Sequence, residues 1–150
     1  TADDAKAFAV KAAEVRRQLA LDPCTAKDTD MAVPTLIKAL ADGRAEVAIA
    51  AGQALSAMVP PASASEPNPQ RALGQAAMND KVEPARRTAF FAALSESLRR
   101  FGNKLTGEQF ESLKKIATTD ANNEVRLAAA RAAGAAGATI QIEQLILNKK

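Results

Sequence analysis

The residue types that most often carry out chemistry are nearly absent from this sequence of 150 residues. It contains no histidine, and Cys24 is its single cysteine. Histidine is the commonest general base and metal ligand, and a thiol without an activating neighbour is a poor nucleophile. One cysteine cannot form an intrachain disulfide or a thiolate zinc site. We therefore expect no catalytic residue, no cofactor and no metal site, and we expect that the chain is not an enzyme.

The remaining polar motifs are better explained by structure than by chemistry. Ser63 and Ser65 lie in an accessible proline-rich segment, but no base is present to activate them. The acidic residues at 3–4 and 28–30 lack the glycine-centred spacing of a calcium loop. The glycines that end at Gly137 do not form a phosphate loop, because no Lys-Ser/Thr pair follows them, and Gly137 is predicted to end a helix.

The composition indicates which elements must position any functional group. Hydrophobic residues make up 47% of the chain and aromatic residues only 3%, with no tryptophan or tyrosine. The apolar content is mainly alanine, which favours helices and close helix packing, whereas sheets favour branched and aromatic residues. An all-α fold with a real core is predicted for a chain of this length.

Three segments of the sequence follow one pattern, and they begin at Asp42, Asp80 and Asp120. The first two are 38 residues apart and the last two are 40 apart, with small residues at the ninth and twelfth positions after each aspartate. A fainter copy begins at Asp3. Each aspartate stands between two stretches with apolar residues at helical spacing. The repeating unit is therefore predicted to be helix, short turn, helix.

Local signals set the ends of several predicted helices. Pro34 is expected near the start of a first helix, where its missing N–H has no cost. Thr106 and Gln109 form a capping-box pattern. The helix that follows Asp80 is predicted to run to about Phe101. Asp30 is expected to cap the helix that follows a polar loop.

The whole chain, residues 1–150, is interpreted as a single repeat domain. A second loop is expected at the proline-rich residues 60–69. The predicted units are three complete ones and a partial one at each end, namely 1–21, 30–59, 69–102, 106–136 and 138–150. No unit can bury its apolar stripe alone, so the units are expected to stack into one continuous core.

These patterns resemble the HEAT repeat of the armadillo-like α-solenoids. Residues 32–40 are similar to the first helix of that family, and residues 120–133 are similar to its turn and second helix. The resemblance extends over roughly residues 32–147. It implies a right-handed solenoid of stacked helical hairpins with about three full repeats.

Members of the family often stack an aspartate and an arginine from successive repeats into a ladder. The resemblance assigns the acidic positions to Asp42, Asp80 and Asp120. It assigns the basic positions to Arg86 and Arg126. The first copy has an alanine at the basic position, so we expect the ladder to be interrupted there.

The resemblance also implies function: similar proteins mostly bind another protein along the face formed by the second helices. We predict that role, as a scaffold or binding module, for this chain. The residues expected on that face are Gln53, Arg87, Phe91, Ser95 and Arg131. For Phe91 the alternative is that it joins Phe90 in the core.

Two alternatives remain open. The first is nucleic-acid binding: pairs of adjacent basic residues could contact the phosphates if they lie on one ridge. Nearby glutamates instead favour an ordinary solvated surface. The basic doublets are residues 16–17, 86–87, 99–100, 114–115 and 149–150. The second alternative is a non-catalytic accessory subunit similar to the bilin lyases, which also have this architecture. Similar hydroxylases need histidines, which are absent here. Similar DNA glycosylases use aromatic residues, especially tryptophan, and this chain has no tryptophan or tyrosine.

The sequence does not reveal the compartment. No stretch approaches the roughly 20 apolar residues that span a bilayer, so no membrane span is expected. The chain begins at Thr1 without a visible signal peptide. We expect it to be a processed or truncated part of a longer protein.

Overall fold

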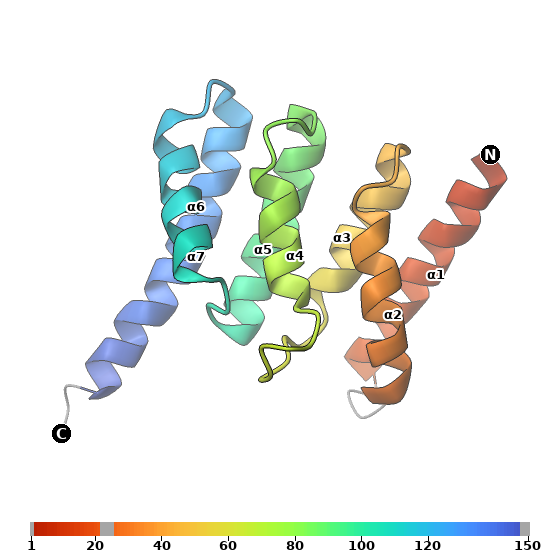
Figure 1. Ribbon diagram of the computed structural model, residues 1–150, viewed down its shortest axis with the longest axis horizontal. Coiled ribbons are helices and arrows are strands. Elements are labelled where there is room, and N and C mark those ends of the chain that lie inside the picture. The colour runs from red at the N-terminus through yellow and green to blue at the C-terminus, as the bar shows by residue number, and fades with distance from the viewer. Residues whose placement is uncertain (1, 22–25, 148–150) are drawn as a thin grey trace.

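The computed structural model describes residues 2–21 and 26–147 of the chain (Figure 1). Within these ranges the chain forms seven α-helices and no strand, so the predicted all-α class is confirmed. The helices are α1 (Ala2–Leu21), α2 (Ala26–Ala39), α3 (Ala45–Ser56), α4 (Pro69–Met78), α5 (Pro84–Phe101), α6 (Gly107–Thr119) and α7 (Asn123–Leu147). None of these helices, over the part of the chain described, is long and apolar enough to cross a bilayer.

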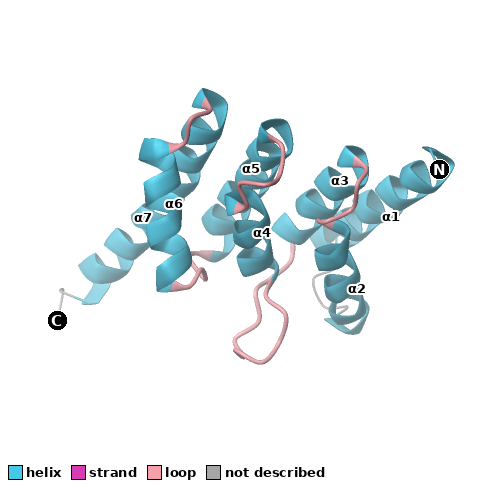
Figure 2. Cartoon of the chain, turned by 45° about the horizontal axis from the view of Figure 1, so that its top comes forward, coloured by secondary structure: helices cyan, strands magenta, loops and turns pink. Residues whose placement is uncertain are grey.

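The helices lie in two layers. Figure 1 shows α2, α4 and α6 in front, with α1, α3, α5 and α7 behind them. The pairs α2–α3, α4–α5 and α6–α7 are antiparallel hairpins that stand side by side in a row. Figure 2 shows their short turns along one edge of the molecule, while the longer loop between α3 and α4 projects from the opposite edge. That loop corresponds to the proline-rich segment predicted from the sequence.

Helix α5 lies at the centre of the core, because it contacts α3, α4 and α7. Phe90, Phe91, Leu94 and Leu98 of this helix are all buried and lie on one side of it, within an arc of about 100°. Gly52 of α3 makes one of these contacts possible. A Cβ atom at Gly52 would lie 3.2 Å from Cδ1 of Phe90, a distance that the buried ring could accommodate only by shifting. The packing of α3 on α5 therefore depends on a glycine at this position.

Alanines account for most of the remaining core of the rear layer. Ala48, Ala51 and Ala54 of α3, and Ala129 and Ala132 of α7, are buried. A methyl group occupies little space, so neighbouring helices in this layer approach each other closely. The alanine content that predicted helices thus also determines how the rear layer is packed.

Helix α1 closes one end of the row. Its buried residues Ala5 and Ala12 belong to the same core as the residues of α3, with which α1 is in contact. The opposite side of α1 exposes charged residues that include Lys6, Lys11 and Glu14. Val10, on the same helix, is 64% exposed, so this side of α1 combines charged residues with an exposed apolar one.

Two predicted helix boundaries are confirmed. The hydroxyl of Thr106 accepts a hydrogen bond from the Gln109 N–H at 3.1 Å, and the Gln109 side chain accepts one from the Thr106 N–H at 3.2 Å, which completes the capping box of α6. Helix α5 does end at Phe101. Both signals depend on neighbours within a few residues, so they can be read without tertiary information.

The start of α2 differs from the prediction. The helix begins at Ala26, so Asp30 lies inside it and does not cap it, and Pro34 lies well inside rather than near the start. A proline inside a helix leaves one carbonyl of the preceding turn without its N–H partner. Pro34 is exposed, so water can reach this part of the helix. The solvent position of Pro34 explains why the helix tolerates it.

The C-terminal unit also differs from the prediction. Gly137 does not end a helix, because α7 continues from Asn123 to Leu147, and residues 138–147 therefore form no separate unit. A glycine ends a helix readily when it adopts a positive φ angle, and among the described residues only Gly102 does so. The alanines around Gly137 have the highest helix propensity of any residue, and they favour continuation.

We predict that Gly137→Ala will increase the free energy of unfolding by about 0.5–1 kcal/mol, because glycine inside a helix loses more backbone entropy than alanine. An added Cβ at Gly137 would meet no atom within 4 Å. Urea denaturation followed by circular dichroism measures the change. Gly134→Ala is the matched control, since Gly134 lies inside the helix whether the helix ends at Gly137 or continues to Leu147. If Gly134→Ala stabilised the chain while Gly137→Ala destabilised it, a continuous α7 would be refuted.

Candidate functional site

The residues that could act as nucleophiles do not meet a base in the part of the chain described. Ser63 and Ser65 lie on the exposed α3–α4 loop, where their hydroxyl oxygens are 2.7 Å apart. Cys24 lies outside the described residues. Among the residues described, no three histidine, cysteine, aspartate or glutamate side chains are grouped closely enough to hold a metal ion. Within the described residues, the remaining candidates are buried polar clusters and exposed surfaces.

The edge formed by the hairpin turns holds the most connected polar cluster of the structure. Arg87 of α5 is only 5% exposed, and its Nε donates a hydrogen bond to the carbonyl of Ala77, at the end of α4, at 3.0 Å. Its Nη1 donates to Oδ2 of Asp120 at 3.0 Å. Asp120 follows the last residue of α6. One buried guanidinium thus joins α4, α5 and the turn between α6 and α7.

The carboxylate of Asp120 accepts two hydrogen bonds, one from its own turn and one from α5. Its Oδ1 accepts the backbone N–H of Asn122 at 3.0 Å, while its Oδ2 accepts from Arg87. These hydrogen bonds, the Asn122 bond first and the Arg87 bond after it, lower the pKa of Asp120 below its ordinary value of 3.8, although partial burial opposes them. Asp120 is therefore charged at neutral pH and balances the buried arginine.

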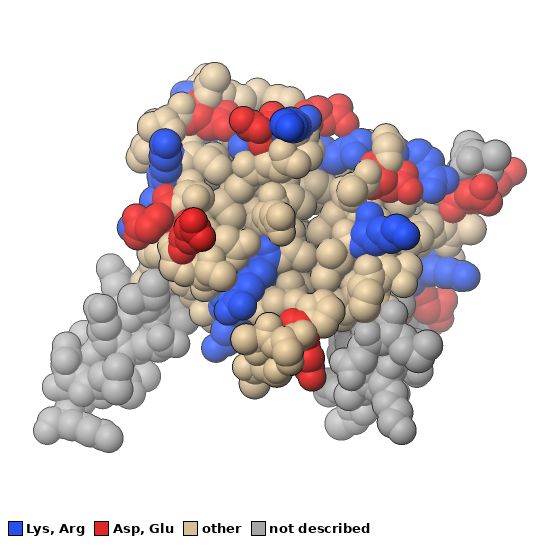
Figure 3. Space-filling model, viewed as in Figure 1, with Lys and Arg blue, Asp and Glu red and all other residues tan. Residues whose placement is uncertain are grey.

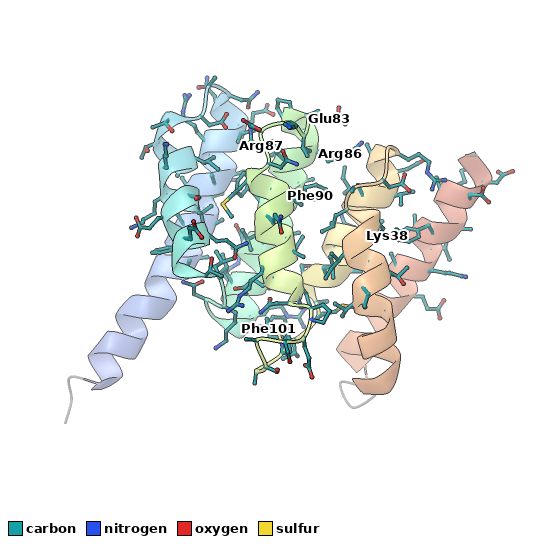
Figure 4. All side chains as sticks on the ribbon, in the orientation of Figure 1. Lys38, Glu83, Arg86, Arg87, Phe90 and Phe101 are labelled. Carbon is teal, nitrogen blue, oxygen red and sulfur yellow. The ribbon has the colours of Figure 1, made fainter. Side chains whose placement is uncertain are left out.

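Arg86, next to Arg87, contacts the preceding hairpin. Its Nη1 donates to the carbonyl of Asp42 at 2.7 Å and its Nη2 to that of Gly43 at 3.2 Å. Nη2 also lies 3.1 Å from Oε1 of Glu83. Figure 4 shows Arg86 and Arg87 together at the upper end of α5, close to Glu83. The two arginines therefore connect the central hairpin to its neighbour on each side.

Asp42 forms its ion pair within its own turn. The carboxylate accepts hydrogen bonds from the Arg44 side chain at 3.0 Å and from the Arg44 backbone N–H at 2.9 Å. The side-chain bond with Arg44, followed by the backbone bond, lowers the pKa of Asp42 to about 2. Arg86 therefore reaches the backbone of the Asp42 turn rather than its carboxylate.

The predicted ladder differs from the observed contacts. Arg126 donates to the carbonyl of Asp120 at 2.6 Å and bonds the side chain of Asn123, both within its own hairpin. Asp80 is exposed and forms none of the ion pairs seen in the described chain. The carboxylate of Asp120 pairs with Arg87 of the preceding hairpin. Arg86 thus contacts the preceding hairpin through backbone carbonyls and not through a carboxylate. The ion pair between hairpins is made by its neighbour Arg87 with Asp120.

Three of the five residues predicted on the second-helix surface are not available to a partner. Arg87, Phe91 and Ser95 are all buried, and Ser95 Oγ donates to the carbonyl of Phe91 at 3.0 Å. These residues face the core because α5 is covered by helices on several sides. The alternative interpretation, with Phe91 in the core, is the correct one. Gln53 and Arg131 are exposed as predicted.

The exposed positions of the rear helices lie opposite to their buried ones. Since α3, α5 and α7 are neighbours in one layer, these positions form a continuous surface, which we call the second-helix face. Leu127 of α7 is 54% exposed on this face. The residues of this face are Glu46, Gln53, Ala85, Ala92, Glu96, Arg99, Leu127, Ala130 and Arg131. The sequence did not predict most of these residues, because the exposed side of a helix is determined by the helices that pack against it.

The front layer presents a different surface. Between α4 and α6 lies an open polar hollow of about 440 Å³, lined by Gln75, Met78, Asn79, Glu108, Gln109 and Ser112. Figure 3 shows this layer from the front, with charged side chains of both signs along the upper edge where the turns lie. The signs are mixed along that edge, and a run of Lys or Arg side chains lies in the lower middle of the same view.

The basic doublets do not form one ridge among the residues described. Arg86 and Arg87 are engaged in the contacts between hairpins. Arg99 lies 3.3 Å from Glu96, and Lys114 lies 2.7 Å from Glu111. The side chains of the doublets at 16–17 and 149–150 lie outside the described residues. The described part of the chain thus offers partly neutralised cations on separate helices.

Comparison with known proteins gives no match: no family model, no curated protein and no solved structure is significantly similar to this chain. Its function must therefore be argued from the residues themselves.

We predict that Arg87→Met and Asp120→Asn will each lower the free energy of unfolding by about 2–3 kcal/mol, because each leaves a buried polar partner without its counterpart. The double variant should lose at least about 1 kcal/mol less than the sum of the single losses, since the two side chains interact directly. A double-mutant cycle measured by urea denaturation gives this coupling. The exposed pair Glu96→Gln and Arg99→Met is the control, with an expected coupling below about 0.5 kcal/mol. Additive losses at Arg87 and Asp120 would contradict the assigned interaction.

The lowered pKa of Asp120 predicts a pH dependence with a definite sign. The stabilising contribution of the carboxylate is complete above the unfolded value of 3.8 and is lost as the pH falls through the lower folded pKa. The difference in unfolding free energy between the wild-type chain and Asp120→Asn should therefore be constant from pH 7 to about 4, and should shrink at lower pH. Urea titrations at a series of pH values test this. A difference that grew on acidification would show that the pKa is raised instead.

Proposed function

We propose that this chain is a HEAT-like α-solenoid module that binds another protein through its second-helix face. The periodic pattern in the sequence supports the assignment of repeats, as does the row of three hairpins. The contacts of Arg86 and Arg87 with the flanking hairpins add further support, because a solenoid is stabilised mainly by interactions between nearest neighbours.

The observation that carries the proposal is the composition of the second-helix face. Its central part, on α5, exposes Ala85 and Ala92, and the adjoining part of α7 exposes Leu127 and Ala130. Charged side chains lie among these residues: Glu96 and Arg99 pair on α5, and Arg131 follows Ala130 on α7. Small apolar side chains interspersed with a few charged ones are compatible with protein binding, since a protein interface as a whole is about as apolar as the rest of the surface.

The buried polar side chains support a structural rather than a catalytic role. Gln70 donates from Nε2 to Ser97 Oγ at 3.1 Å and to the carbonyl of Gly102 at 3.0 Å, and its Oε1 accepts the Lys104 N–H at 2.6 Å. It thereby fastens the start of α4 to the end of α5 and to the loop that follows. Ser56 donates to a backbone carbonyl of its own helix. Side chains so engaged are not free to act on a substrate.

We predict that Ala92→Arg will weaken binding of the natural partner at least tenfold, because a long charged side chain at the centre of a flat interface prevents close contact. The partner is first captured from the source organism with the wild-type chain, then purified, and its affinity is measured by calorimetry. Ser112→Arg is the matched control. It places the same side chain at an exposed position of α6 in the front layer, and it should leave the affinity unchanged.

Equal loss of affinity in both variants, or loss only in the control, would contradict the proposed face. Turnover of a substrate by the purified chain alone would contradict the binding role itself.

Nucleic acid is tested separately by titrating a fluorescent duplex and a single strand at several salt concentrations. Salt-sensitive binding near physiological ionic strength would favour a phosphate-binding solenoid over our proposal.

A further inference from the structure

A small pocket lies at the lower edge of the molecule, away from the second-helix face. It is formed between the loop that joins α3 to α4, helix α2 and the start of α4, and its volume is about 220 Å³. The loop provides most of the lining, α2 provides one residue and the first residue of α4 completes it. The lining residues are Val33, Val59, Pro61, Glu66, Pro67 and Pro69.

The size of the pocket limits what it can hold. Sites for cofactors and drug-sized ligands usually measure about 300–1,000 Å³, so this pocket is smaller than the usual range. A single large side chain of another polypeptide is a better match. Val59 at the pocket is 70% exposed, and an exposed apolar side chain beside a cavity is suited to contact with a partner.

The chemistry of the lining selects the type of side chain. Val33, Val59 and the prolines provide apolar walls, and three of the six lining residues are prolines, which carry a carbonyl acceptor but no N–H donor. Glu66 adds a carboxylate, and in the described chain it makes no ion pair or hydrogen bond. No lining side chain donates a hydrogen bond at neutral pH. The pocket therefore offers acceptors and apolar contact to a ligand that supplies donors and positive charge.

The loop is also held in shape before any ligand arrives. The hydroxyls of Ser63 and Ser65 are hydrogen-bonded to each other, and the Ser65 N–H donates to Ser63 Oγ at 3.3 Å. At the end of the loop, the Asn68 side chain accepts the Arg71 N–H at 3.1 Å and caps α4. Prolines further restrict the backbone. A preorganised loop loses little entropy when it binds.

We propose that this pocket binds an arginine side chain of a partner protein. The aliphatic part of arginine packs on Val59 and the prolines, while the guanidinium pairs with Glu66. Arginine fits this environment better than lysine, because the guanidinium is planar, weakly hydrated and matched to a carboxylate, whereas the lysine ammonium is strongly hydrated. The inference concerns a surface other than the second-helix face, so it can stand or fail independently of the proposed function.

The test uses the whole chain with ¹³C-labelled valine methyl groups and three blocked tripeptides, Gly-Arg-Gly, Gly-Lys-Gly and Gly-citrulline-Gly. We expect the arginine peptide to shift the methyl signals of Val33 and Val59 saturably, with a dissociation constant in the millimolar range. The citrulline peptide has the same shape without the charge and should bind at least two- to fivefold more weakly, as expected for one exposed ion pair. The lysine peptide should also bind more weakly than the arginine peptide.

The variant Glu66→Gln should reduce arginine binding to the level of citrulline. Glu66 is exposed, so the variant should remain folded. Glu108→Gln, at an exposed glutamate beside the other hollow, is the control and should bind the arginine peptide like the wild-type chain. The proposal is overturned if no saturable shift occurs, if Glu66→Gln binds arginine normally, or if lysine binds as tightly as arginine.

Discussion

The buried guanidinium of Arg87 is the interaction on which the arrangement of the hairpins most depends. A charge that has lost almost all of its water must be balanced by hydrogen bonds and by an opposite charge. The carbonyl of Ala77 and the carboxylate of Asp120 meet this requirement, and they come from different hairpins. The α4–α5 hairpin and the turn after α6 are thereby held in one relative position, since any displacement would leave the charge uncompensated.

A second buried polar group acts at the opposite end of the same hairpin. Gln70 forms three hydrogen bonds to Ser97, Gly102 and Lys104, which use both of its amide donors and its carbonyl oxygen. With Arg87 at the turn edge and Gln70 near the other edge, α4 and α5 are fixed at both ends. The alanine-rich packing between these points then supplies contact area, while the polar groups specify the register. The exposed side of α5 is therefore presented on a frame that these buried polar groups fix at both ends.

The sequence was most informative where a structure depends on nearby residues. The spacing of Asp42, Asp80 and Asp120 located the three turns, and the capping box of α6 located a helix start. Prediction failed where the outcome depends on distant neighbours. Residues Arg87 and Phe91 lie on the buried side of α5, and that side is determined by α4 and α7, not by any local pattern.

Helix continuity was misjudged for a related reason: the glycine at 137 can continue a helix or end it, depending on its φ angle. Of the candidate binding surface, the sequence identified Gln53 and Arg131 but not the exposed alanines of α5. Alanine occurs on both sides of that helix, so its position carries no signal of burial. The pocket beside Val59 could not have been predicted, because it depends on how the loop lies against α2.

The alanines between α3, α5 and α7 have a mechanical consequence. An alanine side chain has no rotatable angle that moves a heavy atom, so the buried alanines of α3 and α7 cannot adjust by changing rotamers, whereas the Phe and Leu side chains of α5 can. When a force displaces one helix of this layer, the neighbouring backbone must move with it or the contact must open. A displacement at one end of the row would thus be transmitted to the following hairpins as small rotations of each hairpin as a whole.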